Sequence, residues 1–91
     1  MLGGFRHKGL AELYRIGQSR RIGADYARKC ILILELLDKA TLPEHMNVIG
    51  LRFHGLQGKP HRWAVRVSAN YRITFGWSGE DAIDVDFEDY H

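Results

Sequence analysis

The clearest pattern in the chain is a helical repeat of apolar side chains over residues 24–39. These side chains recur about every 3.6 residues, and good helix formers fill the positions between them. The repeat predicts one long helix packed on a sheet, with an apolar stripe made by Tyr26, Ala27, Cys30, Ile31, Leu34 and Leu37. Ile33 and Leu36 widen this stripe. They either complete one broad core face or present a second surface to a partner chain.

Shorter elements flank the long helix. Apolar side chains at helical spacing predict a helix over residues 8–16, which Gly17 ends. We expect residues 3–6 to form a short first strand. Thr41 and Glu44 have the spacing of a capping box with a proline between them, which predicts a third helical turn through Met46.

From residue 51 onward, apolar and polar side chains alternate. The alternation predicts a strand from Leu51 to Gly55 or Gly58, followed by strands over residues 63–67, 71–77 and 82–87. Each strand then has one buried and one open face. The side chains assigned to the buried face include Trp63, Tyr71, Trp77, Ile83, Val85 and Phe87. The predicted fold class is α+β, a single domain over residues 1–91 with two or three N-terminal helices packed on a twisted antiparallel meander.

Charge is unevenly distributed along the chain, although the net charge is only +2. Residues 1–77 hold all 13 lysines and arginines with 5 acidic residues, a balance of +8, whereas residues 78–91 carry six acidic and no basic residues. A field of this shape attracts polyanions to one face, which favours nucleic acid as the partner. The single Cys30, and the lack of an apolar run suited to a signal or a membrane span, favour a cytoplasmic protein without membrane contact.

Two arginines are the strongest candidates for a phosphate-binding site. Alternation places Arg66 and Arg72 on the open faces of neighbouring strands that a turn at residues 68–70 joins. Their planar guanidinium groups could converge on one phosphate, because each donates two parallel hydrogen bonds and stays charged at any working pH. The alternative is that they pair with nearby acids such as Asp84 or Asp86.

Two histidines add possible proton-transfer groups. His54 has the open-face parity on the preceding strand, and His91 follows Tyr90 at the end of the chain. Near a phosphate, two imidazoles can take the proton of an attacking 2′-hydroxyl and protonate the departing 5′ oxygen, without a metal. Either histidine alone could equally be an ordinary surface residue. No H-x-x-x-H or C-x-x-C spacing predicts a metal site, and no cofactor motif is present.

Four separated motifs resemble one family of proteins. They are F-R-H-K-G-L at residues 5–10, R-F-H-G-L-Q-G at 52–58, W-A-V-R-V-S-A-N-Y-R-I-T-F at 63–75 and D-F-E-D-Y-H at 86–91. Together they resemble the HigB toxins of type II toxin–antitoxin systems, within the RelE/ParE superfamily. The resemblance implies a RelE-like fold and a ribosome-dependent mRNA interferase, which cuts mRNA in the ribosomal A site by metal-independent attack of the 2′-hydroxyl and so inhibits translation.

The resemblance also implies roles for individual residues. Arg66 and Arg72 would stabilise the phosphorane, His54 or His91 would transfer protons, and Tyr90 would orient the substrate or stack on a base. The predicted RNA-binding residues are Lys59, Arg62, Asn70 and Asp89.

The chain departs from the family motif H-P-L-K-G in one loop. Gly55 and Gln57 stand where the motif has proline and lysine. A cation that would hold the phosphate is therefore missing, and Lys59, two residues later, is the candidate to replace it.

The implied partners are the 70S ribosome with its mRNA and a HigA-like helix-turn-helix antitoxin, with operator DNA bound only through the antitoxin. The helix over residues 24–39 and the basic pair Arg20 and Arg21 are the candidate antitoxin contacts. Two alternatives stay open. The same fold could inhibit DNA gyrase in the manner of ParE, or it could be a non-catalytic RNA- or protein-binding module, for which Gln57 is the best support.

Overall fold

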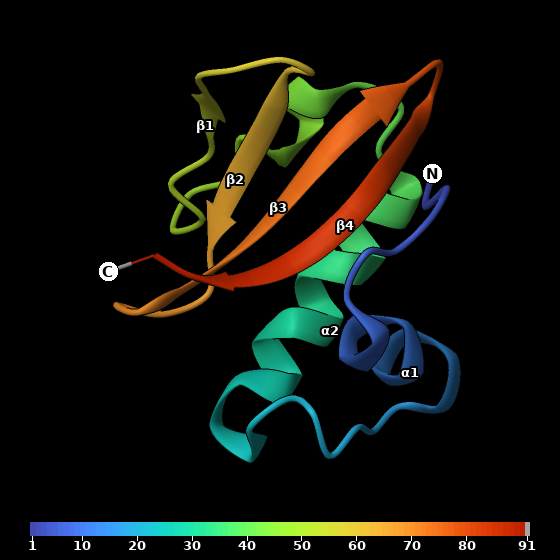
Figure 1. The fold of residues 1–91 in the computed structure, drawn as a ribbon, viewed down its shortest axis with the longest axis vertical. Helices are drawn as coiled ribbons and strands as arrows, with labels where there is room; N and C mark the ends of the chain where they lie inside the picture. Colours follow the sequence, from blue (N-terminus) through green and yellow to red (C-terminus); the bar gives the residue numbers. More distant parts are fainter. Residues whose placement is uncertain (91) are drawn as a thin grey trace.

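The computed structural model describes residues 1–90, so His91 lies outside the described residues. The described chain forms two α-helices on one side of a four-stranded antiparallel sheet, which confirms the predicted α+β class (Figure 1). The elements, in chain order, are α1 (Lys8–Ile16), α2 (Ala24–Lys39), the 3-10 helix η1 (Pro43–Met46), β1 (His54–Leu56), β2 (Arg62–Arg66), β3 (Tyr71–Ser78) and β4 (Asp81–Asp89).

Both α-helices have the predicted bounds. Gly17 ends α1 in the left-handed region, with φ 81°, and its N–H donates to the Leu13 carbonyl. A glycine adopts this conformation without the steric cost that a Cβ imposes. In α2, Ile33 is fully buried and Leu36 is partly buried against the core. These residues therefore complete one broad core face of the helix, as the first of the two interpretations held.

The N-terminal segment is not a regular strand. Isolated parallel bridges join Leu2 to Ala82 and Phe5 to Val85, so this segment lies along β4 without becoming a fifth strand. The third helical turn is present as η1, but the predicted capping box is wrong. Leu42, whose side chain cannot accept a hydrogen bond, occupies the cap position.

The strands follow one another across the sheet in the order β1-β2-β3-β4, as expected for a meander. The first strand is shorter than predicted, because Arg52 has φ 51° and interrupts the extended backbone. A register shift lies between Thr74 and Gly76, and the opposing Asp84 has φ 49°. This irregularity changes the phase of β4, so Ala82 and Val85 are fully buried while Ile83 is only half-buried opposite Gly76. The prediction that Ile83 is buried with Val85 was therefore wrong.

The core lies between the sheet and the two helices. Its fully buried sheet residues include Val65, Ile73, Phe75 and Val85, and Cys30 of α2 is also fully buried. Trp63, Tyr71 and Trp77 are partly exposed but pack against this cluster, in agreement with their assignment to the buried face. Among residues 1–90, no helix is long and apolar enough to cross a membrane.

Candidate functional site

The two candidate phosphate-binding arginines lie directly opposite each other. Arg66 of β2 and Arg72 of β3 are register partners, so their side chains leave the same face of the sheet, as predicted. That face is the one turned away from the helices. Beside the two arginines is a cleft of about 420 Å³, whose lining consists of Arg52, Phe53, His54, Arg66, Arg72 and Tyr90. Five of the six lining side chains can bind or orient a phosphate-containing ligand.

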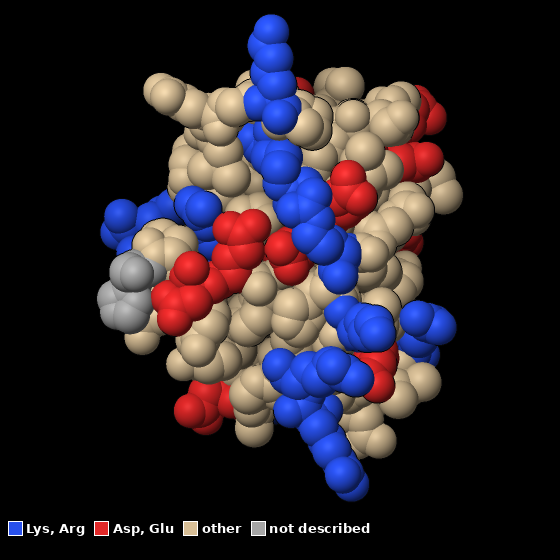
Figure 2. Space-filling view, in the orientation of Figure 1, with Lys and Arg blue, Asp and Glu red and all other residues tan. Residues whose placement is uncertain are grey.

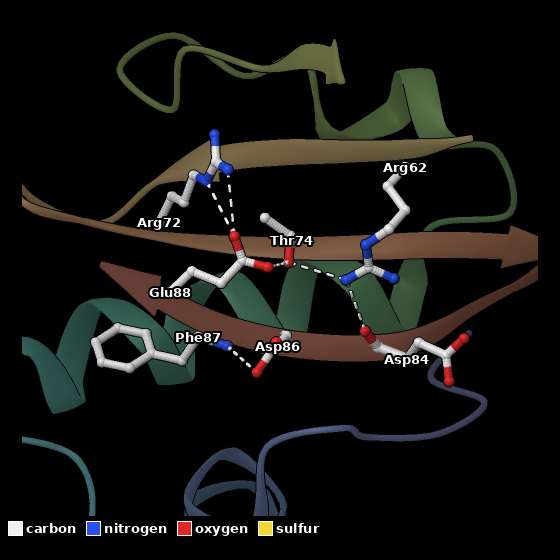
Figure 3. A network of polar contacts seen from close by, with 7 residues as sticks. All are labelled: Arg62, Arg72, Thr74, Asp84, Asp86, Phe87 and Glu88. Carbon is white, nitrogen blue, oxygen red and sulfur yellow. Dashed lines mark hydrogen bonds and ion pairs between the residues drawn. The ribbon is translucent and has the colours of Figure 1, made fainter. Parts of the chain in front are cut away.

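Arg72 is held by contacts on two sides. Its Nη2 and Nε lie 3.2 and 3.4 Å from Glu88 Oε1 (Figure 3). On another side, its Cζ lies 5.1 Å from the centre of the Tyr90 ring. Arg72 lines the cleft and also pairs with an acid of β4, for which the sequence had suggested Asp84 or Asp86. The acid, however, is Glu88. Asp86 instead accepts a hydrogen bond from the Phe87 N–H.

Arg66 and Tyr90 both lie beside the turn between β2 and β3. Arg66 Nε donates to the Ser68 carbonyl at 3.1 Å. The Tyr90 N–H donates to the Asn70 carbonyl at 3.1 Å, which brings the end of the chain next to this turn. Tyr90 is 39% exposed, so part of its ring is open to a ligand.

His54 lies at the start of β1 with an exposed side chain. Its Nδ1 is 2.9 Å from the Arg52 carbonyl oxygen. Since a carbonyl only accepts, Nδ1 must carry the proton in this contact, and in the neutral ring Nε2 is then the free acceptor. The other predicted proton-transfer residue, His91, lies outside the described residues.

The predicted RNA-binding residues are more widely spread. Lys59, Arg62, Asn70 and Asp89 are not among the residues that line the cleft. Lys59 is exposed in the loop before β2, Asn70 is exposed at the turn, and Asp89 faces Tyr71 at the end of β4.

Arg62 points across the sheet instead of into the cleft. Its Nη2 donates to Thr74 Oγ1 and to the Asp84 carbonyl, both at 2.9 Å (Figure 3). Partial burial, with the nearby charge of Arg6, lowers the pKa of Arg62 from its usual value. Arg62 is therefore anchored within the molecule.

Three members of the site were not among the residues predicted from the sequence. Arg52 and Phe53 line the cleft, and Glu88 holds Arg72. Glu88 has the same parity as Asp86 on β4, and Arg52 the same as His54, so parity could have indicated both. The contact between Leu51 and β2, where the Arg66 N–H donates to the Leu51 carbonyl at 2.7 Å, had no signal in the pattern.

Charge on the open face differs from the division inferred along the chain. In Figure 2, basic side chains form a band across the viewed face, with acidic side chains close beside it. The sheet causes this mixture, because antiparallel pairing places β4 next to β3 and Arg72 opposite Glu88. Basic and acidic side chains therefore lie side by side on this face, and the local contacts at the cleft decide what binds there.

The other basic pair lies in the loop between α1 and α2, at the helical end of the molecule (Figure 1). Arg21 Nε is 3.6 Å from Glu12 Oε1, which also accepts from Ser19 Oγ. A hollow of about 530 Å³ beside them is lined by Glu12, Ile16, Gln18, Ser19, Arg20 and Arg21.

Two helices packed on a four-stranded antiparallel sheet are consistent with a RelE-like α+β fold. Residues 3–91 match the family of RelE-like toxins of the type II toxin–antitoxin system HigB. The chain is also 34% identical to the Endoribonuclease HigB of Proteus vulgaris over 92 residues, which covers all of both proteins. The chain thus belongs to the HigB-like toxin family.

Proposed function

We propose that this toxin is an endoribonuclease that cuts mRNA in the A site of the ribosome and so blocks translation. The observation that carries the proposal is the convergence of Arg66, Arg72, His54 and Tyr90 on one open cleft. The relative from Proteus vulgaris, named as an endoribonuclease, supports the same reaction class.

The proposed chemistry is a transesterification within the RNA. The 2′-oxygen attacks the adjacent phosphorus, the bond to the 5′ oxygen breaks, and the products are a 2′,3′-cyclic phosphate and a free 5′-hydroxyl. We assign the removal of the 2′ proton to His54, because its Nδ1–H donates to the Arg52 carbonyl and Nε2 is left as the acceptor. The 5′ oxygen needs a proton as it leaves, and we assign this step to His91.

Cationic side chains would stabilise the negative charge that develops at phosphorus. Arg66 and Arg72 are register partners beside the cleft, and Arg52 also lines it. Three guanidinium groups can supply this stabilisation without a metal ion. We assign to Arg52 the charge that the family motif places at the position of Gln57, because Lys59 is not among the lining residues.

Ribosome dependence would follow from the open form of the cleft. His54 is exposed and Tyr90 is partly exposed, so the toxin alone encloses little of an RNA strand. An mRNA held in the A site would arrive with its backbone already ordered, and that removes much of the entropic cost of aligning the 2′-oxygen. Tyr90 would stack on a base or orient the strand, with Asn70 and Asp89 contacting RNA outside the cleft.

Primer extension on one message tests this function, with the message either translated in a purified system or free of ribosomes. We expect cuts within codons only in the presence of ribosomes. A His54→Ala variant should cut far more slowly. Equal cleavage of free RNA would contradict the ribosome-dependent mechanism. If the wild-type toxin does not cut the message, inhibition of DNA gyrase supercoiling by the toxin would favour the ParE-like interpretation. Salt-dependent RNA binding without cleavage would instead favour a non-catalytic binding module.

The antitoxin would bind at the helical end, away from the cleft. We propose a HigA-like helix-turn-helix protein as the partner, with operator DNA bound only through it, and the cytoplasm as the place of action. Arg20, Arg21 and the exposed side of α2 are the proposed contacts.

An Arg20→Glu/Arg21→Glu variant should bind the antitoxin about tenfold or more weakly, because it reverses two charges at the interface. The matched control is Arg52→Glu/Lys59→Glu, which makes the same charge change near the cleft. Calorimetry with purified antitoxin compares the two. Unchanged affinity of the Arg20/Arg21 variant would place the interface elsewhere.

A further inference from the structure

A carboxylate next to the cleft binds Arg72 without lining the cleft itself. We infer that Glu88 is a positioning residue, which fixes the direction in which Arg72 presents its guanidinium group to the RNA phosphate. The inference rests on the proposed endoribonuclease function. Glu88 would act on the reaction by orienting Arg72 and would not itself contact the RNA.

Both oxygens of the Glu88 carboxylate are bound. Oε1 accepts from Arg72 Nη2 and Nε, and Oε2 accepts from Thr74 Oγ1 at 2.8 Å (Figure 3). The side chains of Arg72 and Glu88 are 23% and 31% exposed, so the pair is partly shielded from water. A carboxylate bound on both oxygens cannot rotate away from the arginine without breaking a second contact.

Thr74 links this pair to a second arginine. Its side chain is fully buried, and its hydroxyl donates its one hydrogen to Glu88. The same oxygen accepts from Arg62 Nη2 at 2.9 Å, and this nitrogen also donates to the Asp84 carbonyl. A hydroxyl has one hydrogen to donate, so the direction of each bond in the series is determined. Hydrogen bonds therefore connect β2, β3 and β4 in the series Arg62–Thr74–Glu88–Arg72. Thr74, which Arg62 contacts in turn, holds the Glu88 carboxylate on the side away from Arg72.

The consequence for Arg72 is a defined orientation. Glu88 occupies the edge formed by Nε and Nη2, and the remaining nitrogen points away from the carboxylate in Figure 3. The Tyr90 ring lies over the guanidinium at 5.1 Å. The nitrogen directed away from Glu88 is the one left to bind a phosphate.

Glu88 also reduces the electrostatic repulsion between the two arginines of the cleft. Arg66 and Arg72 are directly opposite on neighbouring strands, where like charges repel. The negative charge of Glu88 offsets this repulsion and lets both cations remain beside one cleft. Without the Glu88 charge, Arg72 would turn toward solvent. Its guanidinium group would then present a different edge to the phosphate or fail to reach it.

Three variants separate positioning from other roles. Glu88→Gln keeps the shape of the side chain and one acceptor oxygen but loses the charge, and Thr74→Val removes only the hydroxyl link. Asp86→Asn is the matched control, because it makes the same charge change on the same strand and its recorded hydrogen bond is to a backbone N–H. Each variant is first checked for an unchanged melting temperature.

The decisive readout is single-turnover cleavage of ribosome-bound mRNA across a range of toxin concentrations. We expect Glu88→Gln to lower the rate at saturation about tenfold or more, because a small displacement of a positioned group has a large effect on rate. The half-saturating concentration should change little. Thr74→Val should show a smaller loss of the same kind, and Asp86→Asn should cleave at the wild-type rate.

An arginine side-chain NMR spectrum tests the contacts without relying on activity. Glu88→Gln should shift the Nε–H resonances of Arg72 and Arg62, whereas Asp86→Asn should leave that of Arg72 in place. If the wild type cleaves and Glu88→Gln cleaves as fast, the inference is wrong while the proposed function stands. Tighter ribosome binding with an unchanged rate would also overturn it, because Glu88 would then act only by repelling RNA. A wild-type protein that cuts nothing would contradict the proposed function itself.

Discussion

The two faces of the sheet are built from alternate residues of the same strands and differ in almost every property. Toward the helices, Val65, Ile73 and Phe75 are fully buried and apolar. Toward solvent, Arg66 and Arg72 stand side by side above a cleft. Residue alternation in a strand lets one face stabilise the fold while the other carries charge that would destabilise a core. Changes on the two faces should therefore affect different measurements.

The largest effect is expected on the buried face. Phe75→Ala should lower the free energy of unfolding by about 3–5 kcal/mol, because it removes a fully buried ring and leaves a cavity. Urea denaturation measures the change, and Phe75→Leu, which retains most of the volume, should lose clearly less. A loss from Phe75→Ala of under about 1 kcal/mol would mean that this face is not the core.

On the open face, the effect should appear in the rate instead. Arg66→Ala should slow cleavage of ribosome-bound mRNA about 100-fold, the usual scale for removing a group that stabilises charge in a transition state. Its free energy of unfolding should change by less than about 1 kcal/mol, since Arg66 is only partly buried. Arg15→Ala in α1 is the control and should cleave normally. A large loss of stability in Arg66→Ala would contradict the expectation that changes on the open face affect the cleavage rate and not the free energy of unfolding.

The alternation predicted most of this arrangement, because it depends on local spacing. It placed Arg66 and Arg72 together, and the register confirms the pair. It failed at Ile83, where one irregularity changes the phase of β4, and at residues 51–53, where the positive φ of Arg52 shortens β1. The alternation also could not show which acidic residue of β4 pairs with Arg72. Glu88 became the partner of Arg72 through pairing between strands, which no spacing along one strand encodes.

The smallest effect concerns Cys30 in the core under α2. Burial raises the pKa of its thiol from 9.0 to about 12. The unfolded chain then loses this proton at lower pH than the folded protein. The resulting stabilisation of the fold is present below about pH 9 and is lost as the pH rises toward 12. Between pH 8 and pH 10.5, wild type should therefore lose about 2 kcal/mol more than Cys30→Ala. Parallel pH dependence of the two proteins in urea denaturation would contradict a buried thiol.

The role of the cleft in cleavage is best tested by the rate at which Arg72→Ala cuts ribosome-bound mRNA, measured beside wild type at equal folded fraction. Arg72 is the residue on which the cleft, Tyr90 and Glu88 converge. We expect that wild type cuts within codons and that Arg72→Ala, although folded, cuts at least about 100-fold more slowly. A folded Arg72→Ala protein that cuts at the wild-type rate would show that the chemistry does not take place at this cleft.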